Sequence, residues 1–205
     1  MRSEIQPGGQ KARSFIEEAR RDQIVRAAVE VIAEVGFARA SLARIAQRAG
    51  ISKGVISYHF AGKEELMEQV VDRVYAQIGE FVVARMEGAE SAAELLRTHI
   101  VSVAEHMRAN RVQLTALGEI FNNLRTTDGE PRYGVHTSEG LYQALESIYR
   151  RGQDRGEFRA FDVRVMAVTH QAAIDAMFAY WQTHPEHDLE AHARQLADLL
   201  ERACM

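Results

Sequence analysis

The stretch Ser41–Lys63, SLARIAQRAGISKGVISYHFAGK, decides how this chain is organised. Its first part places apolar residues at the spacing of one helical face: Leu42, Ile45, Ala46 and Ala49. That spacing predicts a short helix with one buried side. Ser41 stands at the N-cap position, where its hydroxyl can accept from an early backbone N–H. Gly50 can take the left-handed conformation that ends such a helix at a tight corner.

A second short helix is expected after Ser52. The residues expected to pack inward are apolar: Ile51, Val55, Ile56 and Phe60. The residues left for the outer face are small, polar or cationic: Lys53, Gly54, Ser57, Tyr58 and His59. Two short helices joined by a glycine corner, the second with such an outer face, are typical of a helix-turn-helix that binds DNA.

The run from about Gln23 to Leu66 resembles the DNA-binding domain of the TetR family of bacterial transcriptional regulators. The segments that carry the resemblance are Ala27-Ala28, Val35-Gly36-Phe37, Ile45-Ala46, Ala49-Gly50, Ser52-Lys53-Gly54, Tyr58-His59-Phe60 and Lys63-Glu64-Glu65-Leu66. The rest of the chain is similar to the family only in its length and helical texture. The resemblance implies an all-α fold with a DNA-binding head and a helical body.

The residues predicted to contact DNA are Ser41, Arg44, Ser52, Lys53, Gly54, Val55, Ser57, Tyr58, His59 and Lys63. Gly54 would let the backbone approach the duplex closely. Lys53 can reach a guanine edge or a phosphate, and Val55 could touch a thymine methyl group. Tyr58 and His59 suit phosphate contacts. The family resemblance implies similar roles at the matching positions, which are Ser41, Lys53, Tyr58, His59 and Lys63.

The net charge of −4 hides an asymmetry along the chain. Residues 1–60 contain ten Lys and Arg against six Asp and Glu, whereas residues 61–205 contain 15 basic and 23 acidic residues. A basic head on an acidic body allows the head alone to face phosphates.

The sequence predicts three regions: a flexible arm over 1–19, a helix-turn-helix domain over 20–62, and a helical domain for ligand binding and dimerisation over 63–205. The arm lacks sustained periodicity. Arg2, Lys11 and Arg13 could reach a minor groove, although a leader without DNA contacts is the more economical interpretation.

The first helix of the head is expected from about Arg20 to Val35 and is followed by Gly36. Six body helices are expected after the head. They run from Lys63 to about Met86, from the cap Ser91 through Arg108, from the cap Asn110 through Leu124, from about Thr137 to Arg155, from the cap Asp162 through Gln182, and from Asp188 to near Arg202. The fold class predicted is therefore all-α, with three head helices and about six body helices.

The resemblance implies a homodimer that pairs through the last two long helices. Residues 162–202 fit such an interface because they carry more apolar positions than one subunit needs: Val165, Val168, Ala172, Ala173, Ala176, Ala179, Leu189, Ala193, Leu196, Leu199 and Leu200. Two heads about 34 Å apart would read a palindromic operator.

The resemblance also implies a small-molecule effector in the body, and a largely apolar or aromatic one suits the composition. The residues predicted to line its site are Phe121, Asn122, Tyr142, Gln171, Asp175 and Phe178. Taken individually, each of these residues is better interpreted as part of the plain core than as pocket lining. Asp175 and Glu119, if buried, would favour a cationic ligand, and Glu119 is better interpreted as a solvated helix residue.

Enzymatic readings have little support. The histidines at 184, 187 and 192 lie at a helix break and lack the i, i+4 pair of a helical zinc site. His99 and His106 could share a helical face, but no third ligand is apparent. Without a phosphate loop or an activated nucleophile, we predict no catalytic residues, no metal and no cofactor. Cys204, the single cysteine, is read as incidental.

No apolar run approaches the roughly 20 residues that span a bilayer, and no signal peptide is evident, so a cytoplasmic location is expected. The prediction is a cytoplasmic transcriptional repressor that binds a palindromic operator as a dimer and is released by a small molecule. The alternative is a helix-turn-helix regulator that senses no small molecule or answers to a partner protein.

Overall fold

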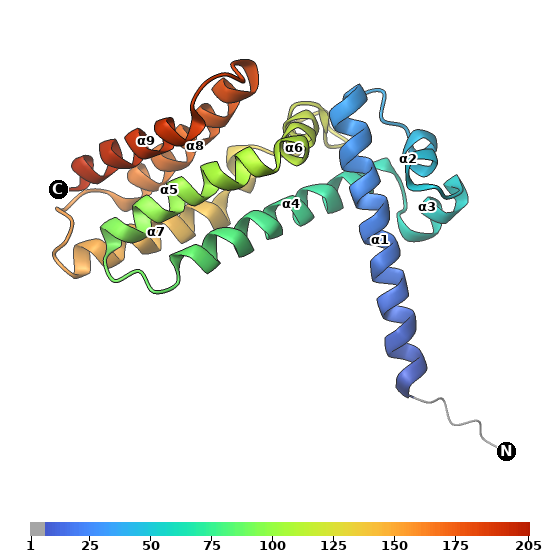
Figure 1. Ribbon diagram of the computed structural model, residues 1–205, viewed down its shortest axis with the longest axis horizontal. Coiled ribbons are helices and arrows are strands. Elements are labelled where there is room, and N and C mark those ends of the chain that lie inside the picture. The colour runs from blue at the N-terminus through green and yellow to red at the C-terminus, as the bar shows by residue number, and fades with distance from the viewer. Residues whose placement is uncertain (1–6) are drawn as a thin grey trace. The chain divides into compact units, whose positions relative to one another are not determined.

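The computed structural model describes the chain from Pro7 to Met205, with side chains described from Ile16 onward. Within that range it contains nine α-helices and no strand, which confirms the all-α prediction. The helices are α1 (Pro7–Val35), α2 (Leu42–Ala49), α3 (Lys53–His59), α4 (Lys63–Met86), α5 (Ala92–Ala109), α6 (Arg111–Asn123), α7 (Glu139–Asp154), α8 (Val163–Thr183) and α9 (Leu189–Cys204), with a short 3-10 turn at Val135–Thr137 (Figure 1).

The contacts divide the chain into two compact units whose boundaries differ from the predicted domain boundary. The first unit holds the residues up to Val74 together with Val112–Gly129, so it contains α6 and the first half of α4 as well as α1 to α3. The second unit holds Tyr75–Arg111 and Glu130–Met205. A later segment of the chain, α6, is thus part of the unit that carries the helix-turn-helix.

The first unit is built around α1, whose apolar positions repeat at helical spacing. Ile24, Ala28 and Ile32 are completely buried. The core they form also includes Ile45 of α2 and Ile56 of α3, both completely buried. Burial of each such side chain contributes about 1.5–3 kcal/mol to stability.

The start of α1 differs from the sequence prediction. The helix begins at Pro7 rather than near Arg20, so the part of the expected arm that follows Pro7 is helical. Proline suits the first turn of a helix because it lacks only an N–H that would have no intrahelical partner there. Arg2 and the side chains of Lys11 and Arg13, proposed for the minor groove, lie outside the described residues.

In the second unit α5 packs on α9 and α7 packs on α8. Three of its helix starts carry the caps expected from the sequence. The Ser91 hydroxyl accepts from the Glu94 N–H at 3.0 Å, and the Asp162 carboxylate accepts from the Arg164 N–H at 2.8 Å. The Asp188 carboxylate accepts from the Ala191 N–H at 2.8 Å. Each cap stabilises its helix by about 1 kcal/mol.

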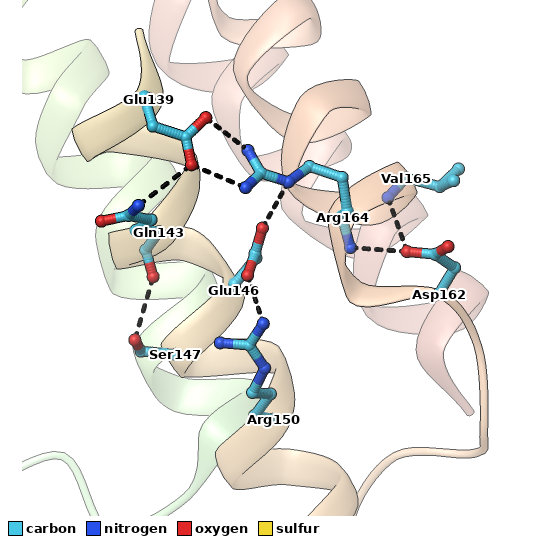
Figure 2. A network of polar contacts seen from close by, with 8 residues as sticks. All are labelled: Glu139, Gln143, Glu146, Ser147, Arg150, Asp162, Arg164 and Val165. Atoms are coloured by element: carbon cyan, nitrogen blue, oxygen red, sulfur yellow. Dashed lines mark hydrogen bonds and ion pairs between the residues drawn. The ribbon is translucent and has the colours of Figure 1, made fainter.

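An ion-pair network fastens the start of α8 to α7 (Figure 2). The Arg164 guanidinium donates to both carboxylate oxygens of Glu139, at 2.7 and 3.0 Å. It also lies 2.6 Å from the carboxylate of Glu146, an ion pair that lacks hydrogen-bond geometry. Arg150 pairs with Glu146 from the other side. The neighbouring Val165 is 60% exposed.

Gly152 in α7 allows an aromatic ring to lie directly on the helix backbone. A Cβ atom at this position would lie 2.2 Å from Cδ2 of Phe158. Phe158 is 5% exposed and packs near Tyr149 and Phe161, with ring centroids 6.2 and 6.5 Å away. The Phe158 ring therefore has little room to move away from a side chain added at position 152.

A chain of polar side chains runs through the second unit. The Tyr149 hydroxyl lies 3.0 Å from Nδ1 of His170, and Nε2 of His170 lies 3.2 Å from Nδ1 of His99. Tyr149 and His170 are completely buried. Burial lowers the pKa of both imidazoles, that of His99 to about 4. Both rings are neutral at pH 7.

The lowered pKa of His99 predicts a loss of stability in acid. The unfolded chain binds a proton at this residue near pH 6.5, whereas the folded chain does so only near pH 4. The free energy of unfolding should therefore fall as the pH drops from about 6.5 to 4, by on the order of 3 kcal/mol. Urea unfolding across this range should show a smaller fall in the His99→Gln variant, which cannot titrate there. Equal pH dependence in the two proteins would contradict the prediction.

In the part of the chain that the structure describes, no helix combines the length and apolar character needed to cross a membrane.

Candidate nucleic-acid interface

The helix-turn-helix has the local geometry that its sequence predicts. The Ser41 hydroxyl accepts from the Arg44 N–H at 3.3 Å and caps α2. Gly50 ends α2 in the left-handed conformation, with φ of 67°. A side chain at that position would be strained, so glycine is the residue that lets α3 follow at a tight angle.

The two sides of α3 differ as expected. Ile56 is completely buried and Phe60, which follows the helix, is 1% exposed. The polar and small residues face solvent: Ser52, Lys53, Gly54, Ser57 and Tyr58. Tyr58 is 76% exposed, an unusual position for an aromatic ring. These residues form one accessible surface, which we call the α3 face.

Val55 and His59 are only partly exposed, at the edge of the α3 face. The His59 ring meets the Tyr58 ring edge-on, with centroids 5.0 Å apart. This contact holds the phenol and the imidazole side by side at the end of α3, where both could reach the same phosphate strand.

The cations of the first unit divide into paired and unpaired groups. Arg48 pairs with Glu30 and Glu34 of α1 and so ties α2 to α1. Arg21 donates to the backbone carbonyl of His59 and stacks over the Phe60 ring at 4.3 Å. By contrast, Arg44 and Lys53 are exposed and form no ion pair with any described residue. These two cations keep their charge available for an anionic partner.

Lys63 holds the turn after α1. Its ammonium donates to the Phe37 carbonyl at 2.6 Å and lies 4.1 Å from the centroid of the Phe37 ring. Burial lowers the pKa of Lys63. One of its three donors is therefore committed within the protein, and its predicted phosphate contact depends on the other two.

Glu119 of α6 binds the same turn, so its interpretation as a solvated helix residue is wrong. Its carboxylate accepts from the Phe37 N–H at 2.8 Å. Gly36, with φ of 78°, lies beside it, and a Cβ atom there would be 3.3 Å from the carboxylate oxygen. The N–H and the carbonyl of Phe37 are thus held by side chains of two different helices, α6 and α4. This long-range contact satisfies a backbone donor at the end of α1.

Gly54 provides a test of close DNA approach that does not disturb the fold. A Cβ atom there would meet only the Ser52 hydroxyl at an ordinary 3.6 Å. Gly54→Ala should therefore stabilise α3 by about 0.5–1 kcal/mol. It should nevertheless weaken DNA binding roughly tenfold or more, because a displaced duplex loses at least one contact worth about 1–3 kcal/mol.

The matched control is Gly79→Ala in the second half of α4, where nothing lies within 4 Å of the added atom. It should gain similar helix stability with no change in DNA affinity, measured by fluorescence anisotropy. Undiminished binding by the Gly54→Ala variant would remove this part of α3 from the contact surface.

The residues predicted to bind an effector are divided between the two units. Phe121 and Asn122 belong to the first unit, and the other four belong to the second. The Gln171 amide donates to the Asp175 carboxylate at 2.9 Å, and Phe178 packs near Trp181 with ring centroids 6.3 Å apart. Burial of the Asp175 carboxylate raises its pKa although the residue as a whole is exposed. Tyr142 is buried under the Arg164 guanidinium, 5.6 Å from its ring centroid. The effector site remains a prediction.

His170, the central member of the buried series of polar side chains, was not predicted from the sequence as a functional residue. His170 lies 71 residues from His99 and 21 from Tyr149 in sequence. No local sequence spacing links such distant residues. Fully buried histidines are uncommon, so each one is a candidate functional residue once the structure is known.

The model of the family described as bacterial regulatory proteins, tetR family, matches residues 24–70, which include the whole helix-turn-helix. The HTH-type transcriptional regulator BetI 1 of Chromohalobacter salexigens is 37% identical over 180 residues, covering 87% of this chain and 86% of that protein. This chain belongs to the tetR family. It is accordingly a DNA-binding transcriptional regulator and not an enzyme.

Other tetR-family relatives extend the likeness through the body. The fatty acid metabolism regulator protein of Bacillus subtilis is 29% identical, covering 87% of this chain and 92% of that protein. A structure of FadR from Bacillus halodurans, described as a fatty acid degradation regulator, superposes with a TM-score of 0.76 at 21% identity, covering 97% of this chain and 96% of that one. The Bacillus subtilis FadR solved in complex with stearoyl-CoA gives a TM-score of 0.75 at 24% identity, covering 89% and 98%. At these identities the structures establish the shared fold.

Proposed function

We propose that this tetR-family regulator is a cytoplasmic repressor that binds a palindromic operator as a homodimer and is released by a small-molecule effector. The observation that carries the proposal is the α3 face, where Lys53, Ser57 and Tyr58 stand exposed on a helix anchored by buried Ile56. The exposed residues offer donors for phosphate oxygens and base edges, while the buried anchor fixes their positions.

Dimerisation is supported by an apolar surface on α8 and α9 within the second unit. Val165, Val168, Tyr180 and Leu199 are 60, 38, 47 and 64% exposed. Between them on α8 lie the exposed small residues Ala172, Ala176 and Ala179. An exposed apolar surface with small residues allows close approach of a second copy. A two-fold dimer would give two α3 faces and thus a palindromic site.

Effector control is supported by the relatives. The Bacillus subtilis FadR structure contains stearoyl-CoA, a small molecule bound to a protein of this fold. In the proposal, an effector that binds better to the form of the protein with low DNA affinity shifts the population toward that form. The loss of operator affinity then equals the effector's differential affinity for the two forms.

The test is selection of bound sequences from a random duplex DNA library with the full-length protein, followed by titration at several salt concentrations. Enrichment of a palindrome, with affinity falling steeply as salt rises, is the expected result. Enrichment of a single, asymmetric half-site would contradict the proposal that the protein binds DNA as a dimer. No enrichment at any salt concentration would contradict operator binding by the free protein.

A further inference from the structure

The buried chain of Tyr149, His170 and His99 joins three helices of the second unit, α7, α8 and α5. Two of its members have no exposed surface, and the distances of 3.0 and 3.2 Å make both contacts hydrogen bonds. Such a chain is expensive to bury unless each polar atom is satisfied. Each hydrogen bond has one donor and one acceptor. An atom with a single available partner fixes which of the two it is, and so fixes the tautomer of each imidazole.

Tyr149 sets that direction. Its hydroxyl contacts Nδ1 of His170 and no other hydrogen-bond partner among the described residues. A buried phenol satisfies its O–H by donating, so Nδ1 of His170 is the acceptor. A neutral imidazole carries one N–H, which places the proton of His170 on Nε2. That N–H donates to Nδ1 of His99, and the remaining proton of His99 must then lie on its own Nε2.

The series of hydrogen bonds ends at His99. His99 Nε2 has no hydrogen-bond partner among the described side chains, and it is absent from the set of buried polar atoms that lack one. His99 retains accessible surface, while its neighbours Leu96 and Ile100 on α5 have none. A side chain can be surrounded closely by protein and still border open space, so this accessibility agrees with the burial that depresses its pKa.

His106 lies on α5 about two helical turns after His99, and its surroundings differ. Both of its ring nitrogens are buried without a partner, and its ring packs edge-on against Phe81 at 5.1 Å. His106 therefore has no accessible donor and no fixed proton position. His99 differs from it in having an accessible Nε2 and a relay that fixes the proton there.

No charged group takes part in the relay. The hydrogen-bond partners in the relay are a phenol and two imidazoles, and no ion pair found among the described residues includes His99 or His170. A neutral donor among neutral groups matches a neutral acceptor better than an ion, because an ion buried there would lack a counter-charge.

We propose that His99 Nε2–H is the donor that anchors the effector, and that the effector carries an uncharged acceptor oxygen such as the carbonyl of a ketone, amide or ester. This inference rests on the proposed effector control and specifies its chemistry. Tyr149 acts as a positioning residue: its O–H sets the tautomer of His170 and, through it, that of His99.

The first experiment tests the relay without any effector. Long-range ¹H–¹⁵N spectra of the full-length protein, labelled at histidine, report which ring nitrogen carries the proton. The expected result is the neutral Nε2–H tautomer for both His99 and His170 at pH 7. In Tyr149→Phe the donor is gone, so a mixture of tautomers is expected at both rings. The Nδ1–H tautomer of His99 in the unaltered protein would overturn the proposal.

The second experiment uses small ketones and amides, each paired with an analogue in which a methylene group replaces the carbonyl oxygen. Binding is followed by the shift of the His99 Nε2 resonance and by Trp181 fluorescence. The oxygen compounds should bind about three- to tenfold more tightly than their analogues, the value of one neutral hydrogen bond. His99→Phe should remove this preference, and His99→Gln, which keeps a donor amide, should retain part of it.

Equal binding of oxygen compounds and analogues would overturn the role of His99 while leaving effector binding intact. Failure of every compound to bind, with the Nε2–H tautomer present, would instead overturn the proposed effector control and this inference with it. The two failures are therefore distinguishable.

Discussion

Lys53→Ala is expected to weaken operator binding by a factor of roughly 30 to 25,000. Lys53 is exposed at the first position of α3 and forms no ion pair with a described residue. A lost base or phosphate contact costs about 1–3 kcal/mol, and a dimer loses it in both half-sites. The measurement is fluorescence anisotropy with the selected operator at several salt concentrations. A lower salt slope would identify a phosphate contact, and an unchanged slope with relaxed sequence preference would identify a base contact.

The matched control is Arg108→Ala, which removes one positive charge from an exposed site on α5 in the second unit. It should leave the affinity for the operator nearly unchanged. Thermal unfolding of the Lys53→Ala protein should match that of the unaltered protein, since the side chain is exposed. Equal operator affinity of the two variants would rule out Lys53 as a contact.

Gly152→Ala is expected to destabilise the second unit by about 3 kcal/mol or more. The added methyl group would overlap the Phe158 ring, whose nearest atom lies 2.2 Å from the Cβ position. The ring is confined by Tyr149 and Phe161, so either α7 or the segment after it must move. Urea unfolding measured by circular dichroism would give the change in stability.

Two further variants separate this overlap from a general effect of alanine. Gly140→Ala lies in the same helix with nothing within 4 Å of the added atom, and should be neutral or stabilising by up to about 1 kcal/mol. Phe158→Leu makes room at the contact, so Gly152→Ala should cost less in that background than in the unaltered protein. An equal cost in both backgrounds would show that the ring is not the cause.

Much of the fold could be predicted from local signals. The bounds of α2 follow from the Ser41 cap and Gly50. In α4 apolar residues recur every four positions, at 66, 70, 74, 78 and 82, and the helix ends at Met86 as expected. The starts of α8 and α9 follow from Asp162 and Asp188. Caps and periodicity are properties of adjacent residues, so one sequence suffices to read them.

The errors come from segments where local signals are weak or contacts are distant. The first turns of α1 have little periodicity, so they were predicted as an arm. A helix does begin directly after Asn110, as predicted, but the Asn110 N–H and side-chain amide both donate to the carbonyl of His106 and so close α5 rather than cap α6. The relay through His170 depends on how α5, α7 and α8 meet, which no single stretch of sequence encodes.

The candidate DNA surface was predictable because the helix-turn-helix is one short continuous segment whose inner and outer faces differ in polarity. The effector site was not, since its lining would come from several helices whose packing the sequence does not give. Glu119 illustrates the difference. Its partner Phe37 is 82 residues away, and without that contact a glutamate on a helix resembles any solvated residue.

The hydrogen bonds from Glu119 and Lys63 to the Phe37 backbone have a consequence for the engineering of hybrid regulators. A head transplanted as residues 1–62 onto a foreign body would lose both side chains that hold the end of α1. A DNA-binding domain for transfer should instead include the segment up to Val74 together with Val112–Gly129, because these segments form one compact unit. The unit of exchange in this protein is thus discontinuous along the chain, and a recombination site chosen from the sequence motif alone would cut through it.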